Sequence, residues 1–413
     1  MGRRRVNLQP IRGRVRVGLP ALLLGAALLL TSACSAGGDG GGKGGSGGGD
    51  GGSGKTGTEA SKAVVSVKPD DGAKEVATNG VLKISSTGGK LTTVTVADTK
   101  GNAVEGKLAG DGASWEPARN LASATEYKVH AVAKDEAGRE SAKDTTFTTL
   151  TPTNTFVGHY TPEDGSTVGV GMPVSVNFTR GITNPEAVEK AITVTAEPSV
   201  PVEGHWFGND RLDFRPEKYW AAGTKVTLKL ALDGVEGRPG VYGKQTRTVT
   251  FTVGRSQVST VDAADHTMQV VRDGQVVKNV PITAGAPSTT TYNGQMVISE
   301  KYKVTRMNGA TVGFGGEYDI SDVPHAMRLT NSGTFVHGNY WASSGTFGSE
   351  NVSHGCVGLR DERGAGDPDE PAAWFFDSSL IGDVVIVKNS KDKTVAPDNG
   401  LNGWNMDWAE WIK

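Results

Sequence analysis

The chain of 413 residues has room for about three domains of ordinary size, so we expect several small hydrophobic cores rather than one. Its 43 basic and 45 acidic residues give a net charge of −2, which gives no reason to expect a nucleic acid as partner. Glycine accounts for 58 residues, and much of the excess lies in one tract near the N-terminus that is typical of a linker. The rest of the chain has a globular composition.

Residues 1–33 have the pattern of a bacterial export signal. Six arginines precede an apolar run at residues 18–30, which is too short to span a membrane comfortably. The run ends in Leu-Thr-Ser-Ala-Cys, which resembles the processing box of bacterial lipoproteins. We therefore expect Cys34 to become the lipidated first residue of an extracytoplasmic, membrane-anchored protein. An ordinary signal peptide, an uncleaved anchor, and Sec or twin-arginine export remain open.

Residues 34–61 are dominated by glycine with scattered serine, aspartate and lysine. Such a composition buries no apolar surface and stays flexible, so the segment is predicted to be a tether. It would let the folded part work at a distance from the membrane.

Two segments of similar size, residues 62–150 and 151–253, look like divergent repeats. Each opens with a proline–acidic–aspartate–glycine turn, at residues 69–72 and 162–165, and continues with short alternating strands. A short helix is indicated only at residues 185–191. Turn-separated strands over about 90 to 100 residues predict two immunoglobulin-like β-sandwiches. Neither segment contains cysteine, so both lack the disulfide of antibody domains.

The third segment, residues 254–388, is again rich in predicted strands. A hairpin is expected around Asp273-Gly274, and a last strand at residues 384–387. A helix is expected at residues 371–376, where proline stands at its first position. The fold class is therefore mainly β: two immunoglobulin-like domains, then a β-rich domain with a short helical extension.

The C-terminal extension, residues 389–413, carries Trp404, Trp408 and Trp411. Spacings of four and three place all three rings on one face of a short helix. We interpret them as a packing stripe that docks on the preceding domains.

The side chains best suited to catalysis lie around Cys356. If Cys34 is lipidated, Cys356 has no disulfide partner, and His337 and His354 flank it in a chain with only seven histidines. A free cysteine has a pKa of about 8.5 and is a few per cent thiolate near neutrality, so it needs a base to become a nucleophile. His354 and Cys356 would point to the same side of an extended segment, whereas His337 can approach from another strand. The spacing alone leaves the choice of base open.

Small residues beside the thiol fit the same chemistry. Gly355 and Gly358 let a substrate carbonyl come close, and their backbone N–H groups could form an oxyanion hole. The motif is therefore suited to acyl transfer.

The pair His337-Gly338, followed 17 residues after His337 by the histidine of Ser-His-Gly-Cys at 353–356, resembles the signature of the L,D-transpeptidases, the YkuD-type enzymes that cross-link bacterial peptidoglycan. The order of anchor, two immunoglobulin-like domains, catalytic domain and tryptophan-containing extension is similar to that of mycobacterial members. The resemblance implies a mostly β catalytic domain, a sheet-based barrel or sandwich with the motif at its mouth.

The resemblance also implies roles for individual residues. Cys356 would be the nucleophile and His337 the general base and acid, oriented by the backbone carbonyl of Gly338, while His354 and Ser353 would shape the site. The candidate substrate contacts are Tyr318, Ser332, Gly333, Ser353, Gly355, Gly358, Trp341 and, on a flexible lid, Met307. Members of the family usually have asparagine two residues after the cysteine, where this chain has Gly358. That contact is expected to be lost, replaced by water, or taken over by Arg360.

The implied reaction is a two-step acyl transfer between peptidoglycan stem peptides, without metal or cofactor, in a monomer that carbapenem-type β-lactams acylate. Three alternatives remain open. Water instead of an amine as acceptor would make the protein an L,D-carboxypeptidase. The residues His337, His354, Cys356 and His325 are metal-capable, which allows a zinc site. The whole chain could also be a non-enzymatic, wall-binding stack of β-domains.

Overall fold

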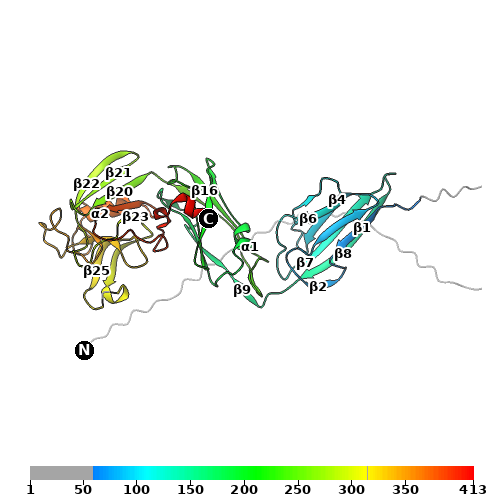
Figure 1. Cartoon of the computed structure of the whole chain (residues 1–413), viewed down its shortest axis with the longest axis horizontal. Helices are drawn as coiled ribbons and strands as arrows, with labels where there is room; N and C mark the ends of the chain where they lie inside the picture. The colour runs from blue at the N-terminus through cyan, green and yellow to red at the C-terminus, as the bar shows by residue number, and fades with distance from the viewer. Residues whose placement is uncertain (1–58, 314) are drawn as a thin grey trace, which may run out of the picture. The chain divides into compact units, whose positions relative to one another are not determined.

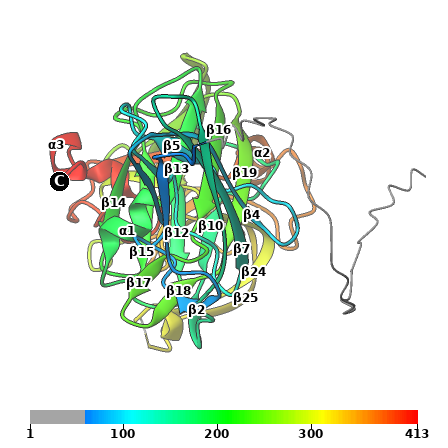
Figure 2. The same ribbon diagram turned by 90° about the vertical axis from the view of Figure 1, so that its right-hand side faces the viewer.

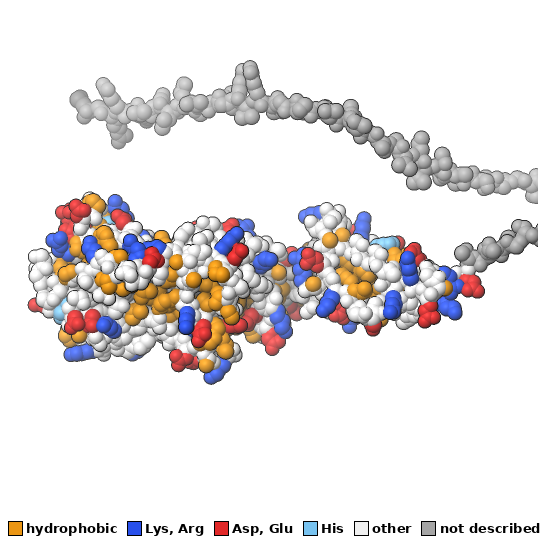
Figure 3. Space-filling view, turned by 90° about the horizontal axis from the view of Figure 1, so that it is seen from above, with side chains coloured by type: hydrophobic (Ala, Val, Ile, Leu, Met, Phe, Trp, Pro, Cys, Tyr) orange, Lys and Arg blue, Asp and Glu red, His pale blue; other side chains and the backbone are white. Residues whose placement is uncertain are grey.

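The computed structural model describes residues 59–313 and 315–413, so the expected export signal, Cys34 and most of the tether lie outside the described residues. The described chain is built of strands with only short helices (Figure 1), which confirms the mainly β class. None of the helices within these ranges has the length and apolar character needed to cross a membrane. On the face shown in Figure 3, acidic and basic side chains are interspersed, as the small net charge suggests.

The first immunoglobulin-like domain consists of two four-stranded sheets with the orders β1-β3-β6-β5 and β2-β8-β7-β4. Its strands are β1 (Val64–Lys68), β2 (Ala73–Val76), β3 (Lys83–Thr87), β4 (Lys90–Asp98), β5 (Gly106–Leu108), β6 (Ser114–Pro117), β7 (Glu126–Lys134) and β8 (Glu140–Thr149). The alternation that predicted strands is visible in β7, where every second side chain from Tyr127 to Ala133 is buried between the sheets.

The second domain repeats this arrangement with the sheet orders β10-β12-β15-β14 and β11-β19-β16-β13, beside a small sheet β17-β18-β9. Its elements are β9 (Asn154–Phe156), β10 (Gly158–Thr161), β11 (Thr167–Val168), β12 (Val174–Phe178), α1 (Pro185–Lys190), β13 (Ile192–Glu197), β14 (Glu203–Phe207), β15 (Arg211–Arg215), β16 (Lys225–Ala231), β17 (Glu236–Arg238), β18 (Val241–Gly243) and β19 (Thr246–Val253). The short helix expected here is confirmed, with proline at its first position.

The two opening turns occupy equivalent places in the two domains. Asp71 Oδ1 accepts a hydrogen bond from the backbone N–H of Thr146 at 2.7 Å, and Asp164 Oδ1 accepts one from Thr250 at 2.8 Å. The glycine after each aspartate has φ of 75°, a conformation that glycine adopts without steric cost. The same residue types therefore fix the same turn twice, as expected of a divergent repeat.

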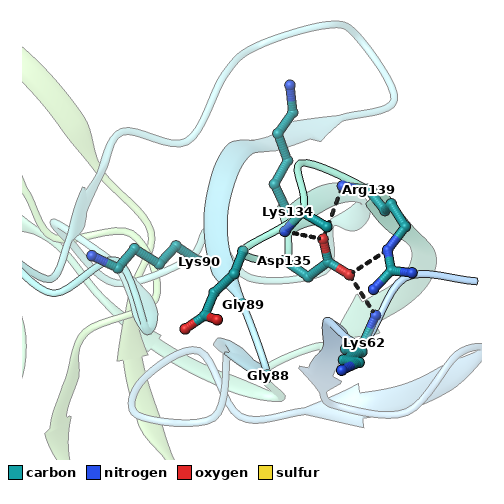
Figure 4. A pocket seen from close by; sticks show the side chains of 9 residues that line it. Lys62, Gly88, Gly89, Lys90, Lys134, Asp135 and Arg139 are labelled. Atoms are coloured by element: carbon teal, nitrogen blue, oxygen red, sulfur yellow. Dashed lines mark hydrogen bonds and ion pairs between the residues drawn. The ribbon is translucent and has the colours of Figure 1, made fainter.

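The beginning of the described chain is tied to the loop between β7 and β8 by Asp135 (Figure 4). Its carboxylate accepts hydrogen bonds from the backbone N–H of Lys62 at 2.9 Å and from the backbone N–H and Nε of Arg139 at 2.9 and 2.8 Å. The bond from Lys62 does most to hold the pKa of Asp135 at about 2.

The third domain is built on one nine-stranded sheet with the order β23-β28-β20-β21-β22-β27-β26-β25-β24. Its elements are β20 (Gln257–Asp262), β21 (Thr267–Arg272), β22 (Gln275–Thr283), β23 (Gly294–Val297), β24 (Glu300–Asn308), η1 (Gly309–Thr311), β25 (Asp319–Arg328), β26 (Phe335–Asn339), β27 (Val357–Arg360), α2 (Pro371–Ser378) and β28 (Val384–Lys388). The expected hairpin joins β21 and β22, and positive φ at Asp273 and Gly274 suits its tight turn.

Strands β26 and β27 lie inside this sheet, between β25 and β22, and run parallel to each other. Their register sets His337 opposite Gly358. Helix α2, whose position was expected from the sequence, packs against β25 and β27. The sequence motif therefore sits on two adjacent strands inside the sheet.

The C-terminal extension does not form the single helix that was expected. Trp404 lies in the 3-10 turn η2 (Gly403–Asn405), and Trp408 and Trp411 begin and end the short helix α3 (Trp408–Trp411). Met406 between them is extended, so a common helical face cannot form. The one-helix interpretation was wrong because the chain bends between the tryptophans.

The docking of the extension is nevertheless confirmed. The Nε1 of Trp404 donates to the carbonyl oxygen of Gly171 at 2.7 Å, and that of Trp411 donates to Glu203 at 3.0 Å, both in the second domain. Figure 2 shows α3 beside β14, which it contacts. All three tryptophan rings face the guanidinium of Arg215, at 4.8, 5.3 and 4.3 Å from its carbon to the ring centroids.

Candidate active site

A cavity of about 350 Å³ in the third domain contains a thiol and two imidazoles within a largely apolar wall. Its lining residues are Met307, Tyr318, Ile320, His337, Asn339, Trp341, Ala342, Thr346, Val352, Ser353, His354 and Cys356. Seven of these are residues singled out from the sequence. The fold therefore brings most of the expected site together.

A larger depression of about 810 Å³ in the first domain has fewer side chains that could catalyse a reaction. The carboxylate of Asp135 at its centre is occupied by hydrogen bonds, and the amino groups of Lys90 and Lys134 point away from it (Figure 4). The cavity around Cys356 combines a thiol with two imidazoles and is therefore the candidate active site.

His337 is held as a neutral imidazole with one free acceptor. Its Nδ1 lies 2.8 Å from the carbonyl oxygen of Gly338, which can only accept, so Nδ1 carries the proton and Nε2 presents a lone pair. Burial lowers the pKa of His337, and the Gly338 carbonyl only partly opposes this effect. The indole of Trp341 stacks on the imidazole with ring centroids 5.7 Å apart. These contacts give the arrangement expected of a general base.

Cys356 follows a tight bend that Ser353 stabilises. The Oγ of Ser353 donates to the carbonyl oxygen of Cys356 at 2.6 Å and accepts from the N–H of Gly355 at 3.2 Å. Gly355 has φ of 108°, which favours glycine. His354 and Cys356 therefore lie on a bend instead of an extended strand, although both line the cavity.

The thiol rests in a neutral form. Its Sγ accepts the backbone N–H of Phe335 at 3.4 Å and points its own hydrogen to the carbonyl oxygen of Gly333 at 3.6 Å. Burial raises the pKa of Cys356 to about 11, although the Phe335 N–H favours the thiolate. In the described part of the chain the thiol makes no hydrogen bond to His337. These contacts favour a neutral thiol over a preformed thiolate–imidazolium pair.

His354 is placed differently from His337. Its Nε2 lies 3.2 Å from Glu317 Oε2, and its ring packs against Tyr318 with centroids 5.0 Å apart. Burial raises the pKa of Tyr318 to about 12, so its hydroxyl stays protonated. His337, whose imidazole is buried in the cavity wall with Nδ1 held by the Gly338 carbonyl, is the candidate for the base.

Four of the expected contact residues do not line the cavity. Ser332 is exposed, and Gly333 reaches the site only through its carbonyl oxygen. The N–H of Gly355 already donates to Ser353, so the expectation that it serves an oxyanion hole is not supported. Gly358 is paired on both sides, with Thr283 and His337, so its backbone belongs to the sheet.

A buried histidine–aspartate pair lies behind the motif. His325 Nδ1 is 2.7 Å from Asp361 Oδ2, and both side chains are buried. Burial raises the pKa of Asp361, and His325 opposes this effect. A Cβ on residue 338 would lie 1.9 Å from Asp361 Oδ2, which explains the glycine after His337. His325 is thus a structural partner of Asp361, and no group of three metal-capable side chains is found in the ranges that the structure describes.

Asn339 is a cavity residue that sequence reasoning missed. It is 4% exposed and stands two residues after His337 on β26, so both side chains lie on the same side of the strand. The alternation of a strand after His337 could have indicated it. Ile320, Ala342, Thr346 and Val352 were missed as well, and their apolar or hydroxyl side chains carry no motif signal.

The chain is similar to known proteins over nearly its whole length. Residues 256–387 match the L,D-transpeptidase catalytic domain, and residues 73–236 match a bacterial Ig domain. L,D-transpeptidase 2 of Mycobacterium tuberculosis is 32% identical over 98% of this chain and 98% of the relative. L,D-transpeptidase 5 of the same species is 30% identical over 84% of this chain and 76% of the relative. The solved structure of LD transpeptidase LdtMt1 in complex with imipenem is 30% identical, covering 57% of this chain and 100% of that chain with a TM-score of 0.47.

Proposed function

The chain belongs to the L,D-transpeptidases, and we propose that it cross-links peptidoglycan stem peptides through a thioester on Cys356. The observation that carries this mechanism is the shared cavity of Cys356 and His337, in which Nε2 of the imidazole is left as an acceptor. The apolar wall favours the neutral forms of Cys356 and His337 in the free enzyme. His337 therefore takes the thiol proton while the sulfur attacks.

In the first step Sγ attacks the carbonyl carbon that precedes the terminal D-residue of a tetrapeptide donor. The thiol proton passes to Nε2 of His337 as the sulfur–carbon bond forms. The imidazolium then gives this proton to the departing amine as the carbon–nitrogen bond breaks. A D-amino acid leaves and the donor remains as a thioester.

In the second step the side-chain amine of a diamino acid on a neighbouring stem attacks the thioester. His337 accepts a proton from this amine, the carbon–sulfur bond breaks, and the proton returns to sulfur. The free thiol and a new amide bond result. Water in place of the amine would give L,D-carboxypeptidase activity.

We further propose that export of the chain ends in lipidation of Cys34, which anchors the enzyme outside the cytoplasmic membrane beneath the wall. The arginine-rich start, the short apolar run and the small residues before Cys34 support this proposal. Replacing Cys34 by alanine should move the protein from the membrane fraction to the medium. Unchanged membrane association would argue for an uncleaved anchor.

The central test is incubation of the protein with disaccharide-tetrapeptides, followed by mass spectrometry. We expect cross-linked dimers that lack one D-alanine, and Cys356→Ala should form none while giving the same near-ultraviolet circular dichroism. Monomeric tripeptides alone would identify a carboxypeptidase. Undiminished dimer formation by Cys356→Ala would overturn the proposed nucleophile.

A further inference from the structure

We propose that the side-chain amide of Asn339 binds a backbone carbonyl oxygen of the donor stem peptide beside the reacting thiol. The proposal rests on the transpeptidase function above and adds to it a residue that recognises the substrate. It also accounts for the missing side chain at Gly358.

The orientation of the Asn339 amide is fixed by its neighbours. Its Oδ1 accepts hydrogen bonds from the backbone N–H groups of Trp341 at 3.2 Å and Ala342 at 2.9 Å. Because only an oxygen can accept these bonds, Nδ2 is the opposite end of the amide. The oxygen therefore has a structural role, and the NH₂ group remains for another purpose.

No hydrogen bond from the NH₂ group to another described residue is found, and Nδ2 is not among their buried side-chain atoms without a partner. It therefore belongs to the small accessible part of Asn339, which is 4% exposed, where water or a ligand can accept its hydrogens. Asn339 lines the cavity of Cys356 and His337. Its Nδ2 is thus an unpartnered donor in the wall of the reaction chamber.

A side chain at residue 358 would border this amide, although its closest approach would be to Thr283. A Cβ on residue 358 would lie 3.4 Å from Asn339 Nδ2 and 2.9 Å from Thr283 Cγ2. Residue 358 is opposite His337 across the parallel pair, so the amide of Asn339 lies beside the place that a side chain after Val357 would fill. The asparagine that the family usually has two residues after the cysteine is absent here. Asn339, two residues after His337, supplies an amide beside the same place.

Arg360, the other candidate for this contact, is engaged elsewhere. Its Nε lies 3.2 Å from Glu370 Oε2, and its side chain does not line the cavity. A neutral NH₂ donor also suits a peptide carbonyl, the acceptor that recurs along every stem peptide. The geometry therefore favours a peptide oxygen as the ligand of Asn339.

Asn339→Asp is the sharpest test, because a carboxylate keeps an oxygen for Trp341 and Ala342 but loses the donor. We expect kcat/KM for a tetrapeptide, taken from the plateau of its pH profile, to fall about tenfold, as for loss of one hydrogen bond. Using the plateau removes the effect of a new carboxylate on the pKa of His337. Asn331→Asp, at an exposed position, is the matched control and should match the wild type.

Two further measurements distinguish a role of Asn339 in binding the peptide from a role in holding the fold. Alkylation of Cys356 by iodoacetamide does not use the NH₂ group, so in Asn339→Asp it should fall much less than peptide turnover does. Asn339→Ala should lose peptide turnover to a similar extent and also melt earlier, because it loses both bonds at Oδ1. A wild-type plateau in Asn339→Asp, or an equal loss of alkylation rate, would overturn the inference. A wild-type enzyme that turns over no peptide would instead contradict the proposed function itself.

Discussion

Asn399 in the C-terminal extension and Ser332 in the turn before β26 exchange two hydrogen bonds. The N–H of Ser332 donates to Asn399 Oδ1 at 3.0 Å, and Asn399 Nδ2 donates to Ser332 Oγ at 2.8 Å. The next residue, Gly333, accepts the thiol hydrogen of Cys356. Arg211 of the second domain donates to the carbonyl oxygen of Gly400 at 2.7 Å. One short segment of the extension thus links the second domain to the turn that contacts the nucleophile.

Replacing Asn399 by alanine should therefore lower kcat/KM for a tetrapeptide, although residue 399 does not line the cavity. Loss of two side-chain hydrogen bonds would loosen the Ser332 turn, and we expect a decrease of roughly three- to tenfold. Steady-state kinetics of D-alanine release is the measurement. Glu410→Ala, exposed in α3, is the control, and equal activities of the two variants would show that the extension does not position the turn.

The pKa directions at the site predict how activity depends on pH. His337 must be unprotonated to accept the thiol proton, and burial lowers its pKa below the ordinary value of 6.5. The kcat/KM should rise as pH increases through this lowered pKa and then stay level through neutrality. The pH profile of D-alanine release measures this.

The ionisation of the Cys356 thiol should be seen in its alkylation rate and not in the pH profile of D-alanine release. Because burial raises the pKa of Cys356 to about 11, its alkylation by iodoacetamide should still increase above pH 9, the ordinary value for cysteine. N-acetylcysteine serves as the exposed reference thiol. An alkylation rate that is already constant below neutrality would instead reveal a thiolate–imidazolium pair.

Gly338→Ala should destabilise the third domain and reduce activity together. Its new Cβ would meet Asp361 Oδ2 at 1.9 Å, and shifting the strand would move the carbonyl that orients His337. Overpacking of this kind costs about 3 kcal/mol of unfolding free energy. Urea denaturation monitors stability. Gly345→Ala, where a Cβ meets nothing within 4 Å, should be neutral, and equal stabilities of both variants would contradict the close contact.

Arg215→Ala should release the C-terminal extension. The buried guanidinium faces three tryptophan rings and donates to the carbonyl oxygens of Pro216 at 3.1 Å and Met406 at 2.9 Å. Burial lowers the pKa of Arg215 to about 10, so it remains charged near neutrality. Loss of these contacts should cost roughly 2–4 kcal/mol. Thermal unfolding followed by tryptophan fluorescence would detect it.

Lys190→Ala provides the control for this variant, because its ion pair with Glu186 is exposed and contributes about 0.5 kcal/mol or less. If the two variants unfold at the same temperature, the tryptophan cluster is not held by Arg215. If kcat/KM of Arg215→Ala falls at a temperature at which the variant is still folded, the tryptophan cluster influences the Ser332 turn.

The sequence by itself determined much of this protein, because the features concerned are local. Alternating apolar residues, glycine-containing turns and prolines at the start of α1 and α2 specify their elements within a few neighbouring residues. The Ser-His-Gly-Cys motif is likewise contiguous, so the family and the candidate nucleophile could be read from it.

The tertiary structure alone decided the relationships between distant residues. The parallel register of β26 and β27 sets Asn339 beside Gly358, and no pattern along either strand encodes that register. The contact of Asn399 with Ser332 spans 67 residues of sequence. The same holds for the tryptophans that gather on Arg215 from separate turns, because such contacts arise only when independently formed elements pack together.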